Sequence, residues 1–600
     1  MGRSRKPKNL GLNTAERRLV AAASARELCD FGDANLASSG AGKKKWVLRA
    51  QIIRFLCVGD SMQQLHEREL AVRGASIEGC LDLAGATVPR PLAFQDCLFL
   101  QKPVFSGATM KGLRLSGCRV PGLEAEELDC TGSVHLDEDF DSTGEIRLAG
   151  ATIKGQLCCS RARVTTETRY AINAQGIKCS EGVFLDGAFV AKGEVNFAEG
   201  DIGLALVCSG ATLRNPDGFA LNAQGLQCRG TVALSEGFSA EGEVSLARAN
   251  LVGQLTCEKG TFRNGSGCAL NLEGLVCRSD VFLNDGFSAT GEVSLAGASV
   301  AGQLSCSGGT LTNPSGCALN GQGLECRGDI FLRSGFCAEG EINLVGANVS
   351  GQVSCMTATV AGSLILQGAR VGEQFFWSQI RHPDKAVVNL DGAHVATLVT
   401  DRASAPQQLI LNRLTYDAFD PIDNMSLQLS WLAGADFDTQ PYQELARVLR
   451  QHGHADSAIS VLMAGEKRRL REQSTRIPER LRGWVLAWTL GHGYRPGRAV
   501  IWLTALWLLG WRVFAVAGRN HLMLPAPNLP PSDGGFGWLE ALFYSLDTML
   551  PVINLGVGEA WNPSRAGTFV WIYWRLHVAL GWLFSTLAVL GFTGLVRKKD

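Results

Sequence analysis

The chain lacks the cysteine spacing that zinc ribbons and thioredoxin-type redox motifs require. It has 600 residues and nineteen cysteines, all between Cys29 and Cys355, and no C-x-x-C pair occurs among them. A metal site or redox site of these kinds is therefore not indicated. The first twenty residues are basic but contain no continuous apolar segment, so they do not form a secretory signal. These absences favour a cysteine-rich region that stays in the reducing cytoplasm.

Charge and missing motifs exclude further classes of function. The 57 basic and 57 acidic residues give a formal net charge of zero, which does not fit the strongly basic surface of a nucleic-acid-binding protein. The chain has no G-x-G-x-x-G after a predicted strand, no C-x-x-C-H haem motif and no P-loop. We therefore expect no nucleic-acid partner, and we identify no catalytic residue, no metal ligand and no cofactor-binding residue.

Glycine, by contrast, is abundant and belongs to a repeat. The chain has 70 glycines but only six tyrosines, a composition typical of many tight turns. The segment GEIRLAGATIKGQLCC starts at Gly144, and similar segments follow at a constant step of 49 residues. They start at Gly193, Gly242, Gly291 and Gly340. A second block, AINAQGIKC from Ala171, recurs with the same step.

The apolar residues of each repeat alternate over about three positions, which predicts short strands and no helix. Strands this short are stable only when they stack, so the sequence predicts a mainly β fold with a parallel β-helix solenoid over residues 71–400. Residues 1–70 are expected to form a helical cap, with a helix in the segment 46–60. Each repeat is expected to form two coils, one with a longer corner loop such as TNPSG at 312–316.

The repeat also aligns like residues into ladders. Equivalent cysteines are expected to lie about 10 Å apart, too far for a disulfide, so we interpret them as core fillers and not as a redox relay. The glutamates are expected to form a solvated stripe that discourages sideways sheet association, and not a catalytic or cation-binding row. The ladders are Cys159, Cys208, Cys257, Cys306 and Cys355; Cys179, Cys228, Cys277 and Cys326; and Glu145, Glu194, Glu243, Glu292 and Glu341.

These Leu, Ala, Gly and Cys-spaced coils resemble a degenerate pentapeptide-repeat protein over about half of the chain. The resemblance implies a right-handed, four-sided β-helix that acts as a rigid binding or spacing surface. The strict five-residue A-[DN]-L-x-x register is broken repeatedly, so the resemblance does not define the shape of the coil.

The periodicity changes after residue 400, where the sequence predicts a helical connector over 401–482 that contains a helix hairpin at 441–472. Two long apolar segments follow, at 499–517 and 568–596, within a membrane domain of residues 483–600. Ten of the thirteen tryptophans follow residue 480, as expected near membrane interfaces. Basic residues precede the first span and end the chain, including Arg597, Lys598 and Lys599. Both termini are therefore predicted to face the cytoplasm at the inner (cytoplasmic) membrane.

Between the spans lies an apolar segment, 537–558, that is too short to cross a bilayer and is predicted to be re-entrant. Its stretch ALFYSLDTM at 541–549 resembles the pore helix of bacterial potassium channels in residue type and order. The resemblance implies a homo-oligomer, a tetramer by analogy, with a filter-like loop after this helix. The pore-like or filter-like residues are Asp547, Pro551, Asn554, Gly556, Gly558 and Glu559. The T-V-G-Y-G filter sequence is absent, so potassium selectivity is not supported.

Three functions remain open at this point. The first is a channel-like oligomer, anchored in the lipid bilayer, whose cytosolic solenoid senses or docks an unknown protein partner. The second is a non-conducting scaffold in which the helix hairpin only tethers the solenoid. The third comes from a resemblance alone, because chains of this general appearance are often labelled membrane-associated oxidoreductases, although the residues contain no cofactor motif for that activity.

Overall fold

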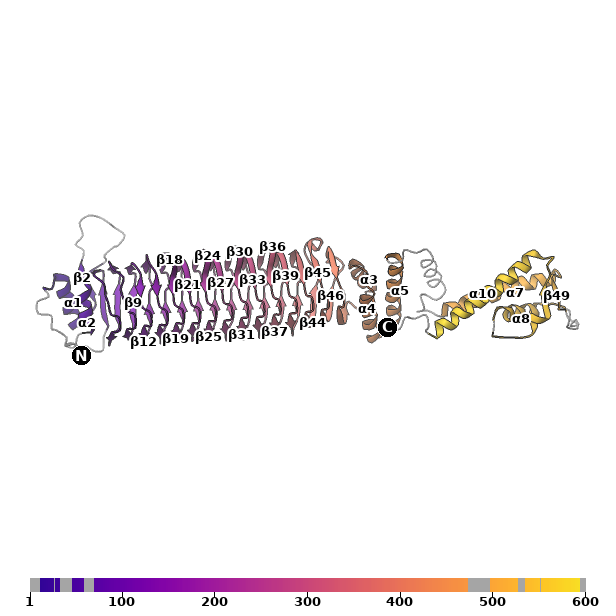
Figure 1. The fold of residues 1–600 in the computed structure, drawn as a ribbon, viewed down its shortest axis with the longest axis horizontal. Helices are drawn as coiled ribbons and strands as arrows, with labels where there is room; N and C mark the ends of the chain where they lie inside the picture. Colours follow the sequence, from indigo (N-terminus) through magenta and orange to yellow (C-terminus); the bar gives the residue numbers. More distant parts are fainter. Residues whose placement is uncertain are drawn as a thin grey trace. The chain divides into compact units, whose positions relative to one another are not determined.

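The computed structural model describes residues 11–25, 27–32, 46–58, 69–472, 497–526, 535–550 and 552–593. The chain divides into two compact units, Met1–Asp436 and Phe437–Asp600, and each is described by itself. The first unit is a parallel β-solenoid of about 15 turns, which confirms the predicted mainly β fold (Figure 1).

Each coil of the solenoid consists of four short strands. One coil comprises β12 (Asp129–Cys130), β13 (Val134–His135), β14 (Asp141–Ser142) and β15 (Ile146–Arg147). They pair in parallel with β16 (Thr152–Ile153), β17 (Leu157–Cys158) and the two halves of β18 (Arg163–Asn173) in the next coil. One residue of each two-residue strand points inward and the other outward, which explains the alternation in the sequence.

Between Asp129 and Asn348 successive coils alternate in length. Thr152 pairs with Asp129 in the coil before it and with Lys178 in the coil after it. The coil that ends at Lys178 is the longer of the two, and a short and a long coil together make one repeat. The additional residues of the longer coil form a corner loop. In β36 (Thr310–Asn320) the register against β39 (Cys337–Asn343) shifts between Thr312 and Cys317, around the TNPSG segment. In the structure each 49-residue repeat thus has two coils, one of them with a longer corner.

The longer coils place equivalent strands of eleven residues in one row of the stack (Figure 1). These strands are β18, β24 (Thr212–Asn222), β30 (Thr261–Asn271) and β36. The intervening coils contribute seven-residue strands to the same row, namely β21 (Val190–Asn196), β27 (Ser239–Ser245), β33 (Ser288–Ser294) and β39.

The core of the solenoid is a column of apolar side chains and thiols. Both cysteine ladders are buried, and all nineteen cysteines, which lie in the described part of the chain, are free thiols. Burial raises the pKa of the Cys306 thiol to about 12, so this thiol stays protonated at neutral pH. Phenylalanines stack in the same column, with ring centroids 5.3 Å apart for Phe238 and Phe262 and 5.2 Å apart for Phe262 and Phe287. The ladder cysteines are core fillers, as predicted.

The glutamate ladder is less solvated than the sequence predicts, because Glu194 is buried and the other four glutamates are only partly exposed. The Glu194 side chain is 2% exposed and accepts hydrogen bonds from Arg169 Nε, at 2.9 Å, and from Asn222 Nδ2, at 3.1 Å. The bond from asparagine to glutamate recurs one repeat later, where Asn271 Nδ2 lies 3.0 Å from Glu243 Oε1. A carboxylate this far from water requires such donors, so these residues connect neighbouring coils.

The first coils are covered by two helices, α1 (Thr14–Ala25) and α2 (Ala50–Val58). The second helix is shorter than the predicted segment 46–60, because Val47–Arg49 forms strand β2 and residues 59–60 lie outside the described residues. Glu16 is fully buried and binds Arg49, with Oε1 2.7 Å from Nε. Asn13 and Glu16 also form a reciprocal capping pair at the start of α1, with both bonds at 2.8 Å.

The strand stack ends at β46 (His394–Thr400), β47 (Gln408–Ile410) and β48 (Thr415–Asp420), which all pair in parallel with the preceding coil. Helix α3 (Met425–Gly434) follows, with the Asn424 side chain accepting the Leu427 amide at its first turn.

The second unit is mainly helical where it is described. It begins with the helix pair α4 (Gln440–Gln451) and α5 (Ala455–Glu472), which pack against each other as the sequence predicts. The unit then contains α7 (Gly497–Arg519), α8 (Trp538–Met549), the one-turn α9 (Val557–Ala560) and α10 (Thr568–Phe592). Two short antiparallel strands, β49 (Met523–Pro525) and β50 (Trp561–Pro563), join the end of α7 to the start of α10.

Candidate functional site: a loop between two apolar helices

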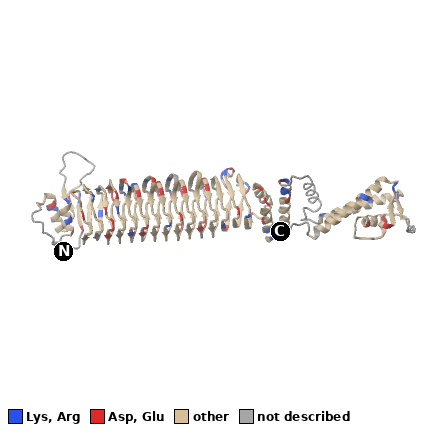
Figure 2. Ribbon diagram, viewed as in Figure 1, with Lys and Arg blue, Asp and Glu red and all other residues tan. Residues whose placement is uncertain are grey.

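Helices α7 and α10 are long and apolar enough to cross a membrane. A helix of 23 residues is about 35 Å long, which exceeds the roughly 30 Å of a bilayer core. Only 22% and 17% of their most apolar windows are buried within the structure, whereas the core helix of a soluble protein is mostly buried. Figure 2 shows few charged residues along these two helices, although such residues recur along the solenoid.

Helix α8 packs against both apolar helices but is too short to cross a bilayer. Its twelve residues span about 18 Å. The Glu540 carboxylate accepts the Gly537 amide at 3.1 Å and so begins the helix. Two indole groups of α7 donate hydrogen bonds to backbone carbonyls of α8. Trp507 Nε1 donates to Leu542 O at 3.1 Å, and Trp511 Nε1 donates to Trp538 O at 3.0 Å.

A buried polar network fixes α8 between α7 and α10. Ser545 Oγ donates to Trp507 O at 2.9 Å and lies 3.3 Å from His577 Nε2. His577 is fully buried, and its Nδ1 lies 3.3 Å from the Tyr573 hydroxyl on the same helix. Gly510 makes this close approach possible, because a Cβ at this position would overlap with Ser545 Oγ and the His577 ring. The three helices therefore form one packed group.

The loop after α8 is organised by the Asp547 carboxylate. Its Oδ1 accepts the Leu555 amide and its Oδ2 accepts the Gly558 amide, both at 2.7 Å. Two short bonds to one carboxylate are of the strong, charge-assisted kind. The end of α8 is thereby tied to the loop that follows it.

The remaining predicted residues belong to the same loop. Asn554 Oδ1 accepts the Gly556 amide at 2.8 Å, and Asn554 Nδ2 donates to Glu559 Oε1 at 3.1 Å. Gly556 has φ 75°, a left-handed conformation that glycine adopts without steric cost. The structure thus brings together five of the six predicted residues, and Pro551 lies outside the described residues.

The bonds to Asp547 also set the direction of the loop carbonyl groups. In a planar trans peptide the N–H and the C=O point in opposite directions. The Leu555 and Gly558 amides point toward Asp547, so the carbonyls of Asn554 and Val557 point away from it. The loop therefore presents peptide oxygens on the side opposite the carboxylate, an arrangement that can contact a cation.

Sequence reasoning missed the Ser545–His577 network, although a signal for it exists. A serine, a histidine and a glycine interrupt three apolar segments, and such residues inside apolar helices are typical of helix–helix contacts.

The predicted orientation of the two spans depends on basic residues, of which the structure describes only some. Lys467 and Arg471 lie near the end of α5, whereas Arg476, Arg480, Arg482 and the residues 597–599 lie outside the described residues.

Comparisons with protein-family models, curated proteins and solved structures found no match to this chain. The function of the chain is therefore inferred from its residues and their geometry.

Proposed function

We propose that the chain is a subunit of a channel-like oligomer, anchored in the cytoplasmic membrane, whose solenoid senses or docks a cytosolic protein. The supporting observation is the loop that Asp547 holds at the end of a helix too short to cross, between two helices long enough to do so. Irregular backbone at membrane depth is stable only where protein or water covers it. A re-entrant loop therefore needs a water-filled cavity or neighbouring subunits.

The exposure of the loop supports an assembly of several copies. In the single chain Val552 is 92% exposed, Ile553 is 41% exposed and Leu555 is 45% exposed. Two spans cannot enclose a pore alone, so several copies of this loop would surround it. Four copies are proposed by analogy with two-helix potassium channels. The carbonyls of Asn554 and Val557 would then line an ion path, and the Glu559 carboxylates would form a charged ring at its mouth.

The solenoid is proposed to face the cytoplasm, with both chain termini on the same side. Its free thiols fit a reducing compartment. The corner loops of the longer coils recur along one row of the stack, and exposed residues such as Asp217 and Ser315 lie in them. A regular row of exposed loops on a rigid support suits recognition of an extended partner surface.

Recording single-channel currents from the full-length protein in planar lipid bilayers tests this proposal. We expect discrete currents from the wild type and their loss in Gly556→Val, because a β-branched residue is strained at φ 75°. Gly535→Val is the matched control, since Gly535 also has positive φ and nothing lies within 4 Å of its position. It should retain the currents.

The oligomeric state in detergent is measured in parallel by light scattering. A monomer without currents would refute the channel and leave the tethered scaffold as the better function. An oligomer without currents would also favour the scaffold. Absorption bands of bound flavin or haem in the purified protein would favour an oxidoreductase.

A further inference from the structure

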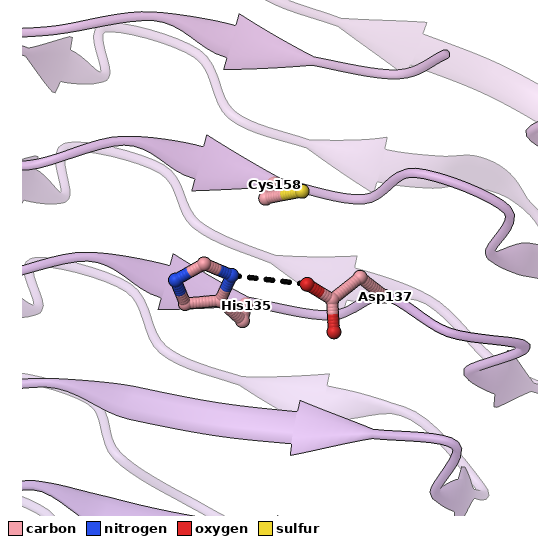
Figure 3. Close-up of side chains that lie close together, drawn as sticks. All are labelled: His135, Asp137 and Cys158. Carbon is pink, nitrogen blue, oxygen red and sulfur yellow. Dashed lines mark hydrogen bonds and ion pairs between the residues drawn. The ribbon is translucent and has the colours of Figure 1, made fainter. Parts of the chain in front are cut away.

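The solenoid contains a cluster of metal-ligating side chains that is unrelated to the loop in the second unit. His135 and Cys158 are neighbours on the paired strands β13 and β17, and Asp137 lies two residues beyond His135. His135 Nδ1 lies 3.0 Å from Asp137 Oδ2. One nitrogen, one sulfur and one oxygen atom of these residues all lie within 4.8 Å of one another. Figure 3 shows the Cys158 sulfur above the gap between the imidazole and the carboxylate.

We propose that His135, Asp137 and Cys158 form a binding site for Zn²⁺. A zinc ion with bonds of about 2.0 to 2.3 Å holds its tetrahedral ligands roughly 3.5 Å apart, so small side-chain rotations bring the three donor atoms to this spacing. Thiolate, imidazole and carboxylate are the three ligand types that zinc binds in proteins. A thiolate with an imidazole also favours zinc over magnesium or calcium, which prefer oxygen ligands.

The surroundings of the cluster suit a metal site with one open position. The His135 side chain is 17% exposed and that of Asp137 is 12% exposed, so the donors are shielded but reachable from solvent. A water molecule can therefore complete the tetrahedron. Ser116 Oγ donates to Asp137 Oδ1, and the Ser160 hydroxyl lies 3.3 Å from Cys158 Sγ. Such outer contacts orient metal ligands and tune their affinity.

The cluster is not required by the fold. In the coils that follow, the positions equivalent to His135 and Cys158 are occupied by Phe184, Val207 and Ala233. These coils form the same strand with apolar side chains, so the solenoid does not need a histidine or a cysteine at this place. Within the described part of the chain, these three residues are the one group of donors that meets this spacing. Arg114 pairs with His135 on the neighbouring strand, on the side opposite Cys158.

Binding of Co²⁺ to the full-length protein in detergent tests the site, because Co²⁺ replaces Zn²⁺ and absorbs light when a thiolate binds it. We expect a sulfur-to-cobalt charge-transfer band that saturates at one equivalent and disappears when Zn²⁺ is added. Cys158→Ser should abolish the band. Cys80→Ser is the matched control, since Cys80 is an exposed free thiol of the same solenoid, and this variant should keep the band.

A band that persists in Cys158→Ser, or one that both variants lose, would overturn the proposal. Absence of the band in the wild type would also overturn it. A second measurement needs no variant. Zn²⁺ should slow the alkylation of Cys158 by iodoacetamide, followed by peptide mass spectrometry, and should leave the alkylation of Cys80 unchanged. Equal rates at Cys158 with and without Zn²⁺ would refute the site. Neither experiment depends on whether the protein conducts ions.

Discussion

Replacement of Asp547 by asparagine tests the organisation of the loop directly. The carboxylate accepts two backbone amides at 2.7 Å, and an asparagine of the same shape has only one acceptor oxygen. At least one of the Leu555 and Gly558 amides then faces an NH₂ group. A hydrogen bond to a charged acceptor contributes about 1.5 to 3 kcal/mol, and the exposure of Leu555 favours the lower value. A loss of about 1.5 kcal/mol corresponds to roughly tenfold faster exchange of that amide.

Hydrogen–deuterium exchange with mass spectrometry on peptides of residues 550–560, with the protein in detergent, measures this effect. Glu540→Gln serves as the control, because glutamine retains an oxygen acceptor for the Gly537 amide at the other end of the same helix. This variant should leave exchange at Leu555 and Gly558 unchanged. The reasoning is refuted if these amides exchange equally fast in the wild type and in Asp547→Asn.

Two further predictions concern stability. Gly510→Ala places a Cβ against Ser545 and His577 and should destabilise the second unit by about 1 to 3 kcal/mol, which tryptophan fluorescence during heating can detect. Gly497→Ala in the same helix should have little effect, since nothing lies within 4 Å of that position, and equal effects of both changes would contradict the proposed packing. The hydrogen bond from Arg49 lowers the pKa of Glu16 below its ordinary value of 4.5. This bond therefore stabilises the fold fully above pH 4.5. The stabilisation disappears as the pH falls through the lowered pKa. The protection factors of the α1 amides, which correct for the pH dependence of intrinsic exchange, should fall below about pH 4.5 in the wild type and change less with pH in Glu16→Gln; the same pH dependence in both proteins would contradict this account.

Much of the first unit was predictable because each coil repeats the same local pattern. The constant repeat length, the buried cysteine ladders and the extended corner at 312–316 all follow from alternation along one strand and from glycine-rich turns. The prediction of a solvated glutamate stripe was wrong for Glu194, which is buried, for a different reason. The environment of Glu194 depends on Asn222 in the next coil, and a pattern within one segment does not report which donor lies across the stack.

The same limitation explains why the His135 and Cys158 cluster was not predicted. These two residues are separated in the sequence by the length of the shorter coil, so they become neighbours only once that length is known. In the second unit the sequence predicted the apolar helices and the residues of the loop. It did not predict the Ser545–His577 contact, because the pairing of particular helix faces depends on tertiary packing and not on hydropathy.

Between Asp129 and Asn348 the short and long coils alternate strictly, and this alternation limits how this part of the chain can change in size. Each coil rests only on its two neighbours, so the smallest insertion or deletion that restores every contact across the join is one pair of coils, which is one full repeat. Removal of a single coil would place two short coils or two long coils next to each other, and the corner loops would then no longer alternate along the stack. The distance bridged by this unit can therefore vary in steps of about 10 Å while the local structure stays the same.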